Sequence, residues 1–121
     1  MAEAVELVAT CHCGRARIRL PRKPDSVIQC NCTLCTKTGF RGVYFAPEEV
    51  AIEGEFDAYI RSDLKQAYLA NHRCKTCGVL THWTLLGEPP HKRMGINARL
   101  LDEAVVEDLP IKHVDGRSWD E

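Results

Sequence analysis

Three cysteines within one short stretch carry the clearest chemical signal in the sequence: Cys30, Cys32 and Cys35. A cysteine thiolate is both a nucleophile and a metal ligand. If the chain entering this stretch is extended, Cys30 and Cys32 point to the same side, because strand side chains alternate. The two residues before Cys35 leave room for a turn that brings the third sulfur to the same point. Three thiolates without a fourth ligand beside them predict an open metal site, where substrate takes the remaining coordination position.

The other four cysteines form two doublets, Cys11 with Cys13 and Cys74 with Cys77, and a glycine follows each doublet directly. The one-residue spacing of the first doublet fits two sulfurs on the same face of an extended segment. The two-residue spacing of the second is typical of a zinc knuckle. Together the doublets predict a closed four-thiolate zinc site. Spacing alone leaves another pairing open, in which Cys74 and Cys77 complete the site of the first three cysteines.

Metal binding explains the cysteines better than disulfides do. The chain has seven cysteines, an odd number, and its N-terminus lacks the pattern of a signal peptide. Cys11 and Cys13 are also too close in sequence for a comfortable disulfide. Histidines are expected in the core or in solvent rather than at a metal, because none has ligand-like spacing: His12, His72, His82, His91 and His113.

Length and composition predict one compact domain spanning residues 1–121, with 45% hydrophobic residues and a formal net charge of -1. No apolar run is long enough for a membrane helix, and we expect a cytoplasmic protein. The arginine stripe formed by Arg15, Arg17 and Arg19 is interpreted as a solvated sheet face. The near-neutral charge argues against nucleic acid as a partner.

The fold class predicted from the pattern is all-β. Residues 15–20 alternate strictly between arginine and apolar side chains, which is typical of a half-buried strand. No stretch of convincing length has helical periodicity, and residues 103–109 are expected to form one helical turn at most. Further strands are predicted from β-rich runs bounded by Gly, Pro and polar turns, at residues 5–9, 26–29, 43–46, 50–54, 56–61, 66–71, 80–86, 93–101 and 105–106. The strands predicted at residues 56–61 and 66–71 are expected to form a hairpin.

With these motifs the sequence resembles the glutathione-dependent formaldehyde-activating enzyme family, whose domain also occurs in centromere protein V. The resemblance uses all seven cysteines in order and covers nearly the whole chain. The matching elements are Cys11-His12-Cys13-Gly14, Cys30-Asn31-Cys32-Thr33-Leu34-Cys35 with Lys37 and Gly39, and Cys74-Lys75-Thr76-Cys77-Gly78. Weaker support comes from the segment 96–102 and from Asp115-Gly116.

The resemblance implies an all-β fold of the Mss4-like kind with two zinc ions per chain. A structural zinc would be bound by Cys11, Cys13, Cys74 and Cys77, and a catalytic zinc by Cys30, Cys32 and Cys35. The implied activity is of the carbon–sulfur lyase type. It condenses formaldehyde, or a related small aldehyde, with glutathione or another thiol to an S-hydroxymethyl adduct, or runs the reverse reaction.

Two cations near the three-cysteine stretch, Lys37 and Arg41, are candidates for binding the glutathione carboxylates and for offsetting the negative charge of three thiolates. No general base is evident. The alternative functions are a non-catalytic zinc-stabilised binding module and a metal or thiol carrier. An open coordination position favours an enzyme or a carrier over a module, and the sequence does not indicate an oligomeric state.

Overall fold

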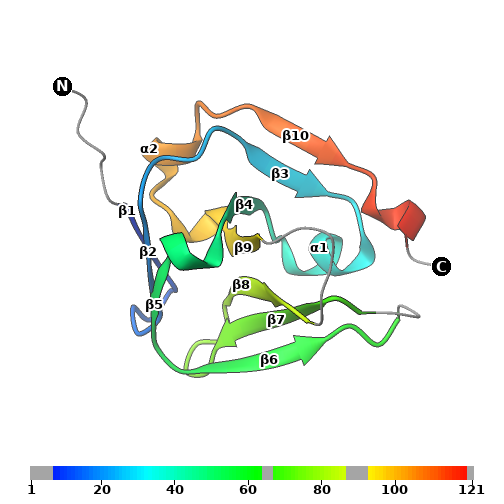
Figure 1. Ribbon diagram of the computed structural model, residues 1–121, viewed down its shortest axis with the longest axis horizontal. Helices are drawn as coiled ribbons and strands as arrows, with labels where there is room; N and C mark the ends of the chain where they lie inside the picture. Colours follow the sequence, from blue (N-terminus) through cyan, green and yellow to red (C-terminus); the bar gives the residue numbers. More distant parts are fainter. Residues whose placement is uncertain (1–6, 64–66, 87–92, 120–121) are drawn as a thin grey trace.

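The computed structural model describes residues 7–63, 67–86 and 93–119, and it confirms the all-β fold class. Two sheets contain all the strands of these residues (Figure 1). The helical segments in them are short: α1 (Thr33–Thr38), α2 (Glu103–Val106), and the 3-10 turns η1 (Pro47–Glu49), η2 (Ala98–Leu100) and η3 (Gly116–Trp119). None of these described helices has the length and hydrophobicity needed to span a bilayer.

The smaller sheet is antiparallel and lies at the left of Figure 1. Its strand order is β1 (Leu7–Thr10), β2 (Arg17–Leu20) and β5 (Ala51–Glu53). The alternation predicted for β2 is present, because Ile18 and Leu20 are fully buried while Arg17 and Arg19 are exposed. The arginines therefore form an outward sheet face and the apolar residues form part of the core.

The larger sheet has seven strands and positions the cysteines. In order across the sheet they are β10 (Ile111–Val114), β3 (Val27–Cys30), β4 (Gly42–Phe45), β9 (Met94–Asn97), β8 (Leu80–Leu85), β7 (Leu69–Cys74) and β6 (Phe56–Ile60). The predicted hairpin is confirmed in β6 and β7, which pair antiparallel, although residues 64–66 of its connection lie outside the described residues. The pair of β10 with β3 is parallel.

β10 was not predicted from the sequence. Three of its four residues are exposed, so it lacks the buried alternation that marks β2. Its partner β3 is distant along the chain, and the pairing is fixed by backbone hydrogen bonds that extend beyond the strands, such as Val27 N–H to the Pro110 carbonyl at 3.0 Å. A parallel partner far away in sequence leaves no local signal.

The strand predicted over residues 93–101 is shorter than expected. β9 ends at Asn97, and the chain turns into η2. The Asn97 side-chain oxygen accepts a hydrogen bond from the Arg99 N–H at 3.1 Å, which is the arrangement of a helix cap. Capping by a polar side chain therefore overrides the β-rich pattern that follows it.

The short strand predicted at Val105 and Val106 is wrong, because both residues belong to α2. The Asp102 side chain accepts a hydrogen bond from the Ala104 N–H at 3.0 Å and starts this single helical turn. The expectation of one helical turn at most in residues 103–109 is confirmed. Two β-branched residues outside a sheet edge do not by themselves make a strand.

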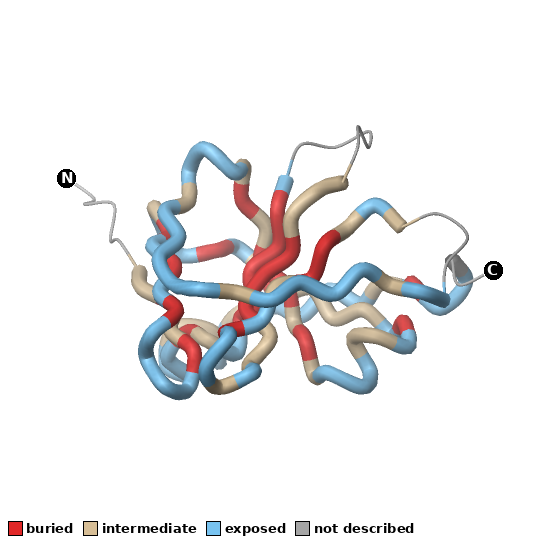
Figure 2. Tube along the Cα trace, turned by 90° about the horizontal axis from the view of Figure 1, so that it is seen from below, coloured by how far each residue is buried: buried red, intermediate tan, exposed pale blue. Residues whose placement is uncertain are grey.

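The core lies between the two sheets. Ile18 and Leu20 of β2 pack with Val43 of β4 and with Met94 and Ile96 of β9. In Figure 2 the buried residues concentrate in the central strands, while most of the surrounding segments are exposed. The larger sheet therefore turns one face to this core, and its opposite face, called here the outer face, carries the other half of the alternating side chains.

A buried histidine stack lies at the β7–β8 end of the core-side face. His82 is only 3% exposed, and its ring stacks on that of His72 with centroids 4.5 Å apart. The Phe56 ring meets His82 edge-on at 5.0 Å. Burial lowers the pKa of His82 to about 4, and the charge of His72 adds to this effect. His82 is therefore a neutral core residue at neutral pH.

Mild acid should destabilise the fold through His82. Its pKa of about 4 lies below the ordinary value of 6.5, so the unfolded chain takes up the proton first and stability falls as the pH drops through this interval. In urea unfolding, the wild type should lose about 2 kcal/mol more than His82→Gln between about pH 7 and about pH 5. The exposed His113→Gln should keep the wild-type dependence. Equal pH dependence in wild type and His82→Gln would contradict the prediction.

Candidate functional site

Four sulfurs from distant parts of the chain meet in one cluster, the tetracysteine cluster of Cys11, Cys13, Cys74 and Cys77. All four lie within 4.8 Å of one another. The Cys11–Cys13 and Cys13–Cys74 sulfur separations are 3.6 and 3.7 Å. Tetrahedral zinc with bonds of about 2.3 Å places its sulfurs about 3.8 Å apart. The cluster thus has the donor set and the dimensions of a four-thiolate metal site.

Each doublet lies on a tight turn closed by its glycine. The Gly14 N–H bonds the Cys11 carbonyl at 3.2 Å, and the Gly78 N–H bonds the Cys74 carbonyl at 2.8 Å. Both glycines have positive φ, 82° and 78°, which other residues rarely adopt. The extended segment predicted for Cys11 and Cys13 is therefore wrong, because His12 and Cys13 belong to a turn after β1.

Backbone N–H groups point at the sulfurs of this cluster. The Ala16 N–H donates to the Cys11 sulfur at 3.3 Å. The N–H groups of Val79 and Cys13 lower the pKa of Cys77 to about 6. Hydrogen bonds to sulfur favour the thiolate, which is the form that binds metal. The arrangement therefore favours the thiolate form of Cys77.

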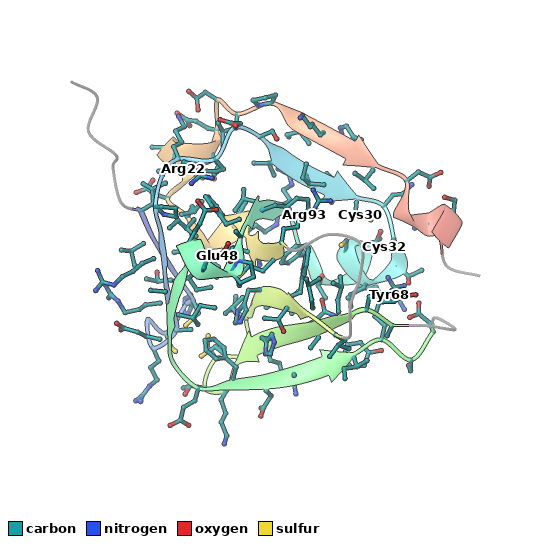
Figure 3. The ribbon with its side chains drawn as sticks, viewed as in Figure 1. Arg22, Cys30, Cys32, Glu48, Tyr68 and Arg93 are labelled. Carbon is teal, nitrogen blue, oxygen red and sulfur yellow. The ribbon has the colours of Figure 1, made fainter. Side chains whose placement is uncertain are left out.

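The second cluster, called here the three-cysteine cup, contains Cys30, Cys32 and Cys35, whose sulfurs also lie within 4.8 Å of one another. Cys30 ends β3, Cys32 caps α1, and Cys35 lies in the first turn of this helix. Figure 3 shows Cys30 and Cys32 side by side at the start of α1. No histidine, aspartate or glutamate of the described residues joins the cup as a fourth ligand.

Helix α1 was not expected, and it supplies the turn that brings Cys35 to the other two sulfurs. It has six residues and none is buried, so it shows no hydrophobic periodicity in the sequence. Its ends explain why it forms. The Cys32 sulfur accepts the Cys35 N–H at 3.4 Å, and Gly39 ends the helix in the left-handed region at a φ of 76°.

The three thiols of the cup differ in their tendency to ionise. Burial raises the pKa values of Cys30 and Cys35. Burial also opposes ionisation of Cys32, but the Cys35 N–H and the neighbouring thiols hold its pKa below the ordinary value. In the protein without metal, Cys32 is therefore the first thiol of the cup to ionise.

The C-terminal segment clamps the residue between the first two cysteines of the cup. The Asn31 side chain donates to Asp115 at 3.0 Å and accepts the Arg117 N–H at 2.9 Å, and Arg117 Nε donates to the Asn31 carbonyl at 3.1 Å. The Gly116 N–H also hydrogen-bonds the Cys30 sulfur. These contacts hold the cup against the end of the chain.

Two aromatic rings lie on the outer face of the sheet near the cup. Gly95 of β9 pairs with Tyr44 of β4 on one side and with Trp83 of β8 on the other. The two rings therefore flank Gly95 on the same face of the sheet. A methyl group at Gly95 would clash with Trp83 Nε1, so only glycine admits the indole there. The rings of Tyr44 and Trp83 meet edge-on, with centroids 5.6 Å apart.

Arginines border the cup and the aromatic rings. Arg61 follows β6, and its side chain, 11% exposed, pairs with Asp63 at 2.6 Å and donates to the Thr33 hydroxyl at 3.0 Å. Its charge contributes to lowering the pKa of Cys32. The Arg93 guanidinium lies 4.5 Å from the centroid of the Tyr44 ring. Cations therefore approach the cup region from the β6 and β9 sides.

The two cations predicted to contact substrate, Lys37 and Arg41, differ in their exposure and contacts. Lys37 is exposed in the last turn of α1. Arg41 is half-buried, and its Nε donates to Gln29 Oε1 at 2.7 Å. Because β3 side chains alternate, Gln29 points to the face opposite Cys30. The described contact thus directs Arg41 away from the cup, and its role toward substrate stays a prediction, as does that of Lys37.

The described histidines do not join either cysteine cluster. His12 and His113 are exposed, and His72 and His82 form the stack in the core; His91 lies outside the described residues. Sequence reasoning missed Tyr44 and the Asn31 clamp. The run 43–46 was recognised only as a strand, although the alternation of β4 already separates Tyr44 from its buried neighbours.

The chain was compared with known proteins. A model of the glutathione-dependent formaldehyde-activating enzyme family matches residues 6–114. Among solved structures, the chain is similar to a protein of Rhodobacter sphaeroides, with a TM-score of 0.65 and 21% sequence identity over 88% of this chain and 100% of that one. This similarity shows the fold alone. No curated protein matches the chain.

Adding a methyl group at Gly95 should disturb the aromatic rings beside the cup. Gly95→Ala forces Trp83 out of its position, and we expect a loss of about 1–3 kcal/mol in the free energy of unfolding and altered tryptophan fluorescence. Gly42→Ala, whose methyl would lie 3.0 Å from Tyr44 Cε1, should cost less. A Gly95→Ala protein with wild-type stability and fluorescence would show that the indole does not depend on this glycine.

Removing the Asn31 side chain should loosen the cup selectively. Asn31→Ala loses the contacts with Asp115 and with the Arg117 N–H. We expect metal at the cup to bind about 10-fold more weakly or worse, because the surroundings of the ligands tune affinity, while the tetracysteine cluster is unaffected. Chelator competition measures both affinities. Ser118→Ala is the control, and equal weakening at both clusters would refute a local clamp.

Proposed function

The chain belongs to the glutathione-dependent formaldehyde-activating enzyme family, and we propose that it is a zinc-dependent enzyme of the carbon–sulfur lyase type. It joins formaldehyde, or a related small aldehyde, to glutathione or another small thiol, giving the S-hydroxymethyl adduct, and it catalyses the reverse cleavage. The observation that carries the proposal is the three-cysteine cup. Three sulfurs converge there without a fourth side-chain ligand from the described residues.

The two cysteine clusters receive different roles in this proposal. Four sulfurs complete a tetrahedral zinc site, so the tetracysteine cluster is assigned the structural ion, held by Cys11, Cys13, Cys74 and Cys77. The cup leaves one tetrahedral position to a substrate and is assigned the catalytic ion, held by Cys30, Cys32 and Cys35. Thiolate ligands suit zinc, which has no preference for other geometries.

The residues around the cup favour a thiol substrate. When bound there, zinc lowers the pKa of a coordinated thiol and polarises a nearby carbonyl. Cys32 is the cup thiol that ionises first, and hydrogen bonds from Asn31 to the C-terminal segment fix the backbone between it and Cys30. Tyr44 and Trp83 lie on the outer face of the sheet, the face that also carries Cys30.

Partners and location follow from the same proposal. Glutathione and formaldehyde are the substrates named by the family description. Lys37 and Arg41 remain our candidates for contacts with the carboxylates of the thiol. The cytoplasm is the proposed location, because free cysteines at this density persist as metal ligands in a reducing compartment. No role for nucleic acid or membrane is proposed.

Zinc content and catalysis should separate the two clusters. Native mass spectrometry should find two zinc ions per wild-type chain, and one in Cys35→Ser with the fold retained. Cys77→Ser should lower the melting temperature strongly, because binding of structural zinc contributes directly to folding. NMR should detect adduct formation from formaldehyde and glutathione above the uncatalysed rate in wild type, but not in Cys35→Ser.

Three results would count against this assignment. A single zinc ion that is insensitive to Cys35→Ser would exclude the two-site arrangement. Two zinc ions without rate acceleration for glutathione or other small thiols would favour a carrier or a binding module. Full activity after Cys35→Ser would remove the cup from the reaction, whereas a destabilised but active Cys77→Ser fits the proposal.

A further inference from the structure

We propose that Tyr44 is the proton donor of the thiol–aldehyde condensation at the three-cysteine cup. The inference rests on the function proposed above and assigns the reaction a catalytic side chain besides the cysteines. Three features carry it: the face of the sheet on which Tyr44 lies, the direction of its ring, and the contacts that hold the ring.

Tyr44 lies on the same face of the sheet as the cup. Its neighbours Val43 and Phe45 belong to the core, so alternation turns Tyr44 to the outer face. In β3 the core residue is Val27, which places Cys30, three residues later, on the outer face as well. The phenol and the cup therefore share one surface of two adjacent strands.

The Tyr44 ring points along its strand toward the cup. A methyl group at Gly42 would lie 3.0 Å from Tyr44 Cε1 and 3.7 Å from Cζ, so the ring reaches back over Gly42. Gly42 is opposite Ile28 in the antiparallel register of β4 and β3. Moving from Tyr44 to Gly42 on β4 therefore corresponds to moving from Ser26 to Ile28 on β3, which is the direction in which the chain continues to Cys30. The hydroxyl end of the phenol is directed at the cup.

Contacts on both sides hold the ring in this direction. Trp83 meets it edge-on at 5.6 Å, and the Arg93 guanidinium lies 4.5 Å from its centroid. Within the described residues, the hydroxyl has no hydrogen-bond partner. Burial raises the pKa of Tyr44, with Arg93 opposing and the cup thiolates adding to the rise, so the hydroxyl holds its proton at neutral pH.

The reaction needs one proton at one atom, and this hydroxyl supplies it. The thiol loses its proton to solvent, and its sulfur attacks the aldehyde carbon and forms the C–S bond. The carbonyl π pair moves to oxygen, and Tyr44 donates its proton there to give the hydroxyl of the adduct. Solvent then returns a proton to the tyrosinate, so the net reaction is thiol plus aldehyde giving the hydroxyalkyl thioether.

A cavity beside Tyr44 provides the solvent for that return. It has a volume of about 140 Å³, and Tyr44, Arg22, Lys23 and Ser26 are among its lining residues. This is room for water, and the side chains of Arg22 and Ser26 are polar partners for it.

Tyr44→Phe tests the donor without removing the ring. In the zinc-loaded enzyme we expect kcat/KM to fall by about 10²-fold or more, the usual contribution of a positioned proton donor, with zinc content unchanged. Tyr59→Phe is the matched control, because Tyr59 is an exposed tyrosine on β6 whose hydroxyl contacts only Ser62 among the described residues. It should keep the wild-type rate.

Binding gives a readout independent of turnover. A stable thioether alcohol, S-(2-hydroxyethyl)glutathione, should bind Tyr44→Phe about 10-fold more weakly than it binds wild type, because a hydrogen bond to its hydroxyl is lost. S-ethylglutathione, which lacks the hydroxyl, should bind both proteins equally. Calorimetry measures both affinities, and a purely structural effect of the substitution would weaken the two ligands alike.

The outcomes separate the two proposals. A wild-type protein that neither accelerates the condensation nor binds these ligands would overturn the proposed function and this inference with it. An active wild type together with a fully active Tyr44→Phe, or with equal weakening of both ligands in Tyr44→Phe, would overturn the inference alone.

Discussion

The structure depends on one constraint, that the larger sheet buries one face and keeps the other free for chemistry. Val43 and Ile96 fill the core from adjacent strands, so their neighbours along each strand must point outward. Tyr44 is such a neighbour, and Cys30 and Trp83 lie on the same face in the flanking strands β3 and β8. The same alternation that stabilises the fold therefore lines up a thiol and two aromatic rings on one surface.

A sheet that buries only one face buries less apolar area, which lowers the free energy of unfolding. A second stabilising interaction is therefore needed. The tetracysteine cluster lies where such cohesion is needed. Cys11 follows the first described strand and Cys74 ends β7, so sulfurs far apart in sequence meet beside Phe56, whose ring contacts that of His82. A metal ion bound there would close a long loop, and closing a long loop removes more entropy from the unfolded chain than a local contact does.

Much of this could be predicted where the signal is local. Alternation identified β2, and the spacing of the cysteines identified the residues whose sulfurs meet in the two clusters. Helix α1 and strand β10 were not predicted, because neither buries a regular series of side chains. The caps of α1 fix the helix, and a parallel partner distant in sequence fixes β10. The Asn31 clamp escaped for the same reason, since Asp115 meets it only after β10 has paired with β3. The pattern of residues along one strand does not show which distant strand it pairs with.

The difference in sulfur number between the clusters decides what else the proposed reaction would require at the cup. Three thiolates around a divalent ion leave a net charge of about -1, which weakens the attraction of the ion for a developing oxyanion. Arg61 offsets part of this charge, and its ion pair with Asp63 reduces that effect. In our proposal a donor outside the cup therefore stabilises the oxygen, and Trp83 and Arg93 hold the ring of Tyr44, the donor that we propose. A phenol is suited to this position, because the thiolate charge that weakens a Lewis acid also keeps the phenol protonated.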